Sequence, residues 1–75
     1  MDFRGLRQRA GFTQYRLAKV SGVNQTTLSQ LELGKVRDPR WSTISALALV
    51  LNTTPGTVAK AIERTATARA RGKVA

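Results

Sequence analysis

With 75 residues, the chain has room for one small domain with a modest hydrophobic core. It contains no cysteine and no histidine, which excludes disulfides, thiolate or histidine metal sites and a histidine-based catalytic triad. Its 13 lysines and arginines face only four carboxylates, and the resulting formal charge of +9 favours a polyanionic partner. We therefore expect a binding protein, not an enzyme, that uses no metal or cofactor.

The first expected element is a helix that begins after Asp2, which can cap it, and ends near Ala10. Phe3 and Leu6 fall on one apolar stripe of this helix, and Gly11 ends it. The N-terminal residues lack the apolar core of a secretory signal, and the longest apolar run, 46–51, is too short to span a bilayer. A cytoplasmic protein is expected.

Residues 14–33 predict two short helices joined by a tight turn. Thr13 can cap the first helix and Asn24 the second. Gly22 lies between the two helices, where the chain turns sharply and a residue without Cβ adopts a positive φ at no cost. Leu28 and Leu31 share one face of the second helix, which is therefore its buried face. Such a unit is rigid.

An apolar stripe predicts a fourth helix, with Asn52 as its end. The stripe consists of Trp41, Ile44, Leu47, Ala48 and Leu51. Thr54 can cap a fifth helix, with Pro55 in the first helical position, which proline favours. The pattern as a whole predicts an all-α, compact five-helix domain over residues 1–63.

A change in composition after Glu63 predicts a basic tail over residues 64–75. Its basic residues are Arg64, Arg69, Arg71 and Lys73. Because no large apolar residue occurs before Val74, we expect nothing in this segment to dock firmly, although it could extend the fifth helix.

The order of residues resembles that of lambda-repressor-like (Xre-type) helix-turn-helix domains, over roughly residues 3 to 62. The matching positions are Gln14, Leu17–Ala18, Gly22–Val23, Leu28, Leu31–Glu32 and Gly34, with Leu6–Arg7, Gly11–Phe12–Thr13, Asp38–Pro39, Ile44, Leu47–Ala48 and Leu51 around them. The resemblance implies a compact five-helix DNA-binding fold with the helix-turn-helix at helices two and three. Residues 24–33 would then be a recognition helix that enters the major groove.

Three positions depart from the family pattern. Arg40 takes the place of the usual serine cap, so the fourth helix is expected to begin at Asp38–Pro39 or at Ser42. Leu33 and Leu49 fall where polar residues are usual, and Leu49 is a candidate contact for another chain.

The outward face of the expected recognition helix carries amides and hydroxyls and no lysine or arginine. An amide can donate and accept together, as adenine N6 and N7 require, and a threonine methyl can meet a thymine methyl. The candidate base contacts are Gln25, Thr26 and Gln30, followed by Ser29 and Thr27.

Cations surround this neutral face, on the preceding helix and in the loop after it, where the phosphates beside a groove would lie. The resemblance to the family adds Gln14, the first residue of the preceding helix, as a further phosphate contact. The candidate backbone contacts are Gln14, Arg16, Lys19, Asn24, Lys35, Arg37 and Arg40. The resemblance also implies an ion pair between Arg7 and Glu32, which would tie the first helix to the end of the recognition helix.

These observations favour a sequence-specific regulator of transcription, repressor or Cro-like, that binds a double-stranded DNA operator as a homodimer. In similar repressors the dimer contact uses the loop before the fourth helix and the last helix, here Val36, Arg37, Pro39 and residues near Val58. Two alternatives use the same domain: an antitoxin, which would also hold a protein partner, and a restriction–modification controller. A cationic membrane-surface binder is disfavoured because the apolar residues are divided among five short helices.

Overall fold

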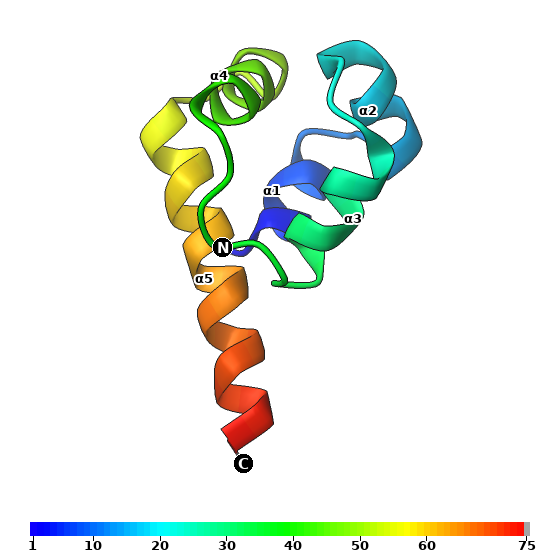
Figure 1. The fold of residues 1–75 in the computed structure, drawn as a ribbon. Coiled ribbons are helices and arrows are strands. Elements are labelled where there is room, and N and C mark those ends of the chain that lie inside the picture. The colour runs from blue at the N-terminus through cyan, green and yellow to red at the C-terminus, as the bar shows by residue number, and fades with distance from the viewer. Residues whose placement is uncertain (75) are drawn as a thin grey trace.

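The computed structural model describes the backbone of residues 1–74 and the side chains of residues 1–72. This part of the chain contains five helices. They are α1 (Phe3–Arg9), α2 (Gln14–Ser21), α3 (Gln25–Glu32), α4 (Trp41–Val50) and α5 (Pro55–Val74). These residues contain no strand, so the predicted all-α class is confirmed. In Figure 1, the long α5 extends beyond the cluster that the other helices form at its N-terminal half. No helix within residues 1–74 has the length and apolar character that crossing a bilayer requires.

Side-chain caps begin four of the five helices, as predicted. Backbone N–H groups donate to Asp2 (2.8 Å), Thr13 (3.1 Å), Asn24 (2.7 Å) and Thr54 (3.2 Å). The exception is α4, which Arg40 precedes without a side-chain capping bond. Because α4 begins at Trp41, the starts expected at Asp38–Pro39 or Ser42 are wrong.

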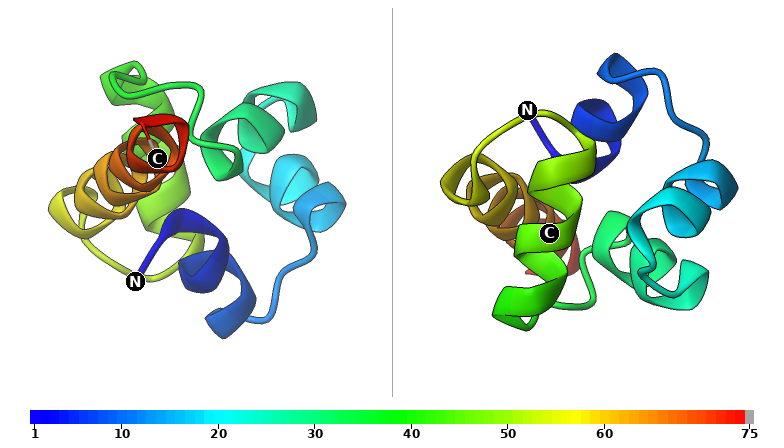
Figure 2. Two further views of the ribbon diagram at one scale, coloured as in Figure 1. Left: turned by 90° about the horizontal axis from the view of Figure 1, so that it is seen from below. Right: turned by 90° about the horizontal axis from the view of Figure 1, so that it is seen from above.

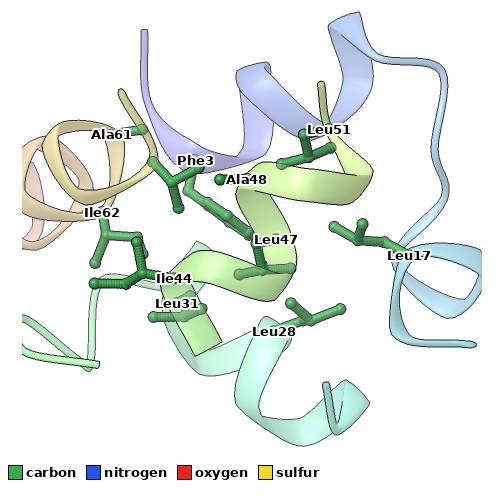
Figure 3. Packing of buried hydrophobic residues seen from close by; sticks show 11 residues of the cluster. Phe3, Leu17, Leu28, Leu31, Ile44, Leu47, Ala48, Leu51, Ala61 and Ile62 are labelled. Atoms are coloured by element: carbon green, nitrogen blue, oxygen red, sulfur yellow. The ribbon is translucent and has the colours of Figure 1, made fainter. Parts of the chain in front are cut away.

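The core takes large apolar side chains from all five helices. Those with no exposed surface are Phe3, Leu17, Leu28, Leu31, Leu47, Val58 and Ile62. Figure 3 shows Ile44 and Leu47 of α4, and Leu51 just after its end, directed toward the other helices. Complete burial of such a side chain contributes about 1.5–3 kcal/mol each, so this cluster fixes how the helices pack.

Trp41 does not belong to this core, although the apolar stripe predicted that it would. Its side chain is 68% exposed. At ~100° per residue, Trp41 is rotated by roughly 70° from the centre of the face that Ile44, Leu47, Ala48 and Leu51 bury. It is also the first residue of α4, so it lies on the flank and at the end of the buried face.

α5 continues through the expected boundary at residue 63 and packs against the domain beyond it. Thr65 and Ala66 are buried, and the backbone N–H of Phe3 donates to Thr65 Oγ1 at 3.0 Å. Arg69 Nη1 donates to the carbonyl oxygen of Leu33 at 3.2 Å. The expectation that nothing after Glu63 docks is therefore wrong for this segment. Of the expected tail, Ala75 and the side chains at 73 and 74 lie outside the described residues.

Candidate nucleic-acid interface

α2 and α3 are held at a fixed angle by the turn between them. Gly22 has φ 76°, and its N–H donates to the Ala18 carbonyl at 3.0 Å, which ends α2. The Val23 N–H donates to Ser21 Oγ at 3.1 Å. The turn residue without Cβ was predicted, because only glycine adopts this φ at no steric cost. The orientation of α3 is therefore fixed relative to α2.

The outward face of α3 exposes Gln25, Thr26 and Gln30, whereas Thr27 and Ser29 are half-buried. The Gln25 Nε2 lies 3.4 Å from Gln14 Oε1, so the amides that begin α3 and α2 meet at one edge of this face. The structure thus brings the predicted base contacts together on one helix. All of them offer neutral hydrogen-bonding groups, which is the chemistry that base edges accept.

The charge of the carboxylate on α3 is compensated inside the domain. Arg7 Nε lies 2.6 Å from Glu32 Oε2, and Arg7 Nη2 donates to Glu32 Oε1 at 3.1 Å. Both side chains are about nine-tenths buried. Because Glu32 faces Arg7 and not the solvent, the outward face of α3 presents no net charge to a polyanion.

Cations lie on the elements beside this neutral face. Arg16 and Lys19 are exposed on α2. The loop after α3 exposes the other three predicted cations, Lys35, Arg37 and Arg40. Exposed cations on the elements before and after a neutral helix are what the phosphates along a groove would favour.

Two predicted backbone contacts have part of their hydrogen-bonding capacity occupied. Asn24 Oδ1 accepts the N–H of Thr26 at 2.7 Å as the cap of α3, which leaves its amide group free to donate. Gln14 is half-buried and uses its amide oxygen toward Gln25. Each can still donate one amide group to an anion at a helix N-terminus.

Tyr15, an exposed aromatic residue on α2, was not among the predicted contacts. The Lys19 ammonium lies 5.4 Å from the centre of the Tyr15 ring, within the range of a cation–π contact. The i, i+4 spacing of the two residues is the signal that would have found it. The contact restricts where the Lys19 charge lies.

The expected dimer contact is only partly at the surface. Arg37 is exposed, and Val36 and Pro39 are half-buried. Val58, however, has no exposed surface, because it packs in the core. The side chain of Val58 itself therefore cannot meet a second chain, but its neighbour Thr57 is exposed, so a contact by residues near Val58 stays a prediction.

Comparison with known proteins agrees with this geometry. The sequence model of a family described as helix-turn-helix domain matches residues 2–61, which is well over half of the chain. The match covers nearly all of the region that resembles lambda-repressor-like domains. No curated protein and no solved structure matches the chain. The chain therefore belongs to the helix-turn-helix domain family, a family of DNA-binding regulators.

Proposed function

We propose that the chain is a sequence-specific binder of double-stranded DNA that regulates transcription in the manner of a repressor or Cro protein. The observation that carries this proposal is the neutral outward face of α3, where Gln25, Thr26 and Gln30 are exposed. α3 would lie in the major groove with its N-terminal end leading. The two glutamines suit adenine, and the threonine suits a thymine methyl or a hydrogen-bonding edge.

In this arrangement the exposed cations bind phosphates and set the position of α3. Arg16 and Lys19 would contact one backbone strand, and the loop cations Lys35, Arg37 and Arg40 the other. Gln14 and Asn24 would donate to phosphates from the starts of α2 and α3. Thr27 and Ser29 are half-buried, so they would contact bases only if α3 inserts deeply into the groove.

A second copy of the chain would bind the other half of a two-fold operator. One recognition helix contacts too few base pairs to select one site in a genome, and two copies on half-sites about 34 Å apart solve this problem. α4 supports self-association, since it carries no charged residue and exposes two large apolar side chains, Leu49 (83%) and Trp41 (68%). A neutral surface is where two chains of formal charge +9 can approach with least repulsion.

Selection from a pool of random duplexes tests the proposal. We expect enrichment of one palindromic sequence whose half-site centres are separated by roughly 10 base pairs. Sedimentation of the chain with that duplex should show two copies per site, and Leu49→Lys should reduce this to one. Recovery of sequences no different from the starting pool would contradict sequence-specific binding.

A further inference from the structure

A hollow of about 560 Å³ lies on a part of the surface that the proposed DNA contacts do not use. It is open to solvent and is lined by Met1, α1, the turn between α4 and α5, and α5. Leu6, Leu51 and Ala61 supply apolar lining, and two further residues, Lys60 and Arg64, are exposed at its edge. A hollow of this size with a few polar groups around an apolar lining is typical of binding sites.

The hollow and α3 lie on opposite sides of the domain. In both views of Figure 2, the N-terminus and the α4–α5 turn lie on one side, and α3 lies on the other. No residue of α2 or α3 lines the hollow. Cations on the side away from α3 do not face the phosphates that border a groove occupied by α3. DNA binding by α3 therefore leaves them without a role.

The cations form a row that continues along α5. Arg9 on α1 also lines the hollow, and Lys60, Arg64, Thr67 and Arg71 line a second depression farther along the helix. At 1.5 Å per residue, the row from Lys60 to Arg71 is ~17 Å long. We call the hollow and this row together the α1–α5 groove.

The groove keeps its positive charge unpaired. The second depression includes one carboxylate, Glu63. Within residues 1–72, the one ion pair is that of Arg7 with Glu32, so neither Glu63 nor another carboxylate pairs with Lys60 or Arg64. An apolar hollow followed by unpaired cations is complementary to a ligand with an apolar end and several negative charges.

We propose that the α1–α5 groove binds an acidic segment of a partner protein. One large apolar side chain of that segment occupies the hollow above Leu51 and Ala61, and its carboxylates follow Lys60, Arg64 and Arg71 along α5. An extended chain of about five residues spans the row at ~3.3 Å each. Phosphates of a second duplex have nothing to place against the apolar lining. Because the groove faces away from α3, the partner and DNA bind at the same time.

Fluorescence anisotropy with the full chain tests this proposal directly. The probe is a labelled peptide of one phenylalanine followed by four glutamates. We expect saturable one-to-one binding at 150 mM salt, and clearly weaker binding when glycine replaces the phenylalanine. Lys60→Ala/Arg64→Ala should weaken the binding about fivefold, as expected for two exposed charge contacts.

Arg16→Ala/Lys19→Ala is the matched control, because it removes the same charge from α2. It should leave peptide binding within about twofold, since no residue of α2 lines the groove and salt weakens longer-range attraction between exposed charges. Equal weakening by both double variants, or equal binding of the glycine peptide, would show attraction to net charge alone and overturn the proposal. A selected duplex at saturation should not displace the peptide, and displacement would also overturn it. The peptide measurements do not depend on whether the chain is sequence-specific for DNA.

Discussion

Arg7 and Glu32 form an ion pair with two hydrogen bonds, which joins α1 to the last residue of α3. The Arg7 Nε lies 2.6 Å from Glu32 Oε2, and the side chains are only 10% and 8% exposed. Arg7 Nη1 also donates to the carbonyl oxygen of Phe12 at 2.7 Å, just before α2 begins. One guanidinium therefore connects three elements, and it restricts how α3 can tilt relative to the rest of the domain.

We predict that Arg7→Ala lowers the free energy of unfolding by about 3 kcal/mol, because Glu32 would be left buried without a counter-ion. Arg9→Ala removes an exposed charge from the same helix and should cost less than about 0.5 kcal/mol. Urea titration of the two variants measures the difference. Equal midpoints would mean that the buried pair contributes no more than a surface charge.

Thr65 should be a structural residue of the domain. Its Oγ1 accepts the Phe3 N–H and donates to the Ala61 carbonyl at 2.8 Å. Thr65→Val keeps the volume but leaves the Phe3 N–H without an acceptor, and we expect a loss of about 1–3 kcal/mol in stability. Thr65→Ser, which keeps the hydroxyl, should lose less in the same urea titration. A valine variant as stable as the serine variant would contradict the role of this hydrogen bond.

Gly34 should tolerate substitution far less than Gly22, although both have φ near 75°. A Cβ at Gly34 would lie 2.7 Å from the Thr65 carbonyl oxygen and 2.9 Å from Arg69 Cβ, whereas a Cβ at Gly22 meets nothing within 4 Å. Gly22→Ala therefore pays the left-handed backbone cost alone, roughly 1–2 kcal/mol. Gly34→Ala adds a clash with α5, for a total of roughly 3 kcal/mol or more. Thermal unfolding of the two variants checks this. Equal melting temperatures would show that α5 can shift to relieve the clash without a loss of stability.

The local features of this fold could be predicted from the sequence because their causes are local. The caps at Asp2, Thr13 and Asn24 and the turn at Gly22 depend on side chains within three residues of the backbone that they serve. The outward face of α3 followed in the same way from helical spacing. Such features require no knowledge of distant parts of the chain.

The docking of α5 beyond residue 63 could not be predicted, because that part of the helix does not use large apolar side chains. It depends on the hydroxyl of Thr65, the close approach of Gly34 and a hydrogen bond from Arg69, which each look like ordinary tail or turn residues in the sequence. Trp41 was placed wrongly for a related reason. Periodicity gives the face of a helix but not where the neighbouring helices stop covering it.

DNA affinity should depend strongly on salt. If three to four phosphates are neutralised per chain, a dimer should lose affinity with a slope of log K against log salt of about −6. Lys19→Ala should reduce the size of this slope by about 1 for each chain, because it removes a phosphate contact. Lys60→Ala removes the same charge from the opposite side of the domain and should leave the slope nearly unchanged. Equal effects of the two lysines in a salt series would contradict the proposed placement of the duplex.

The most direct test of base contact by α3 is the ratio of affinities for the selected duplex and for a random duplex. Gln25→Ala and Gln30→Ala should each cost about 1–3 kcal/mol on the selected duplex, leave random-duplex affinity nearly unchanged and relax preference at one base pair of each half-site. Gln8→Ala, a change of the same kind at an exposed position of α1, should leave the ratio as it is. If Gln25→Ala and Gln30→Ala weaken the affinity for the selected and the random duplex equally, α3 does not contact bases through these side chains.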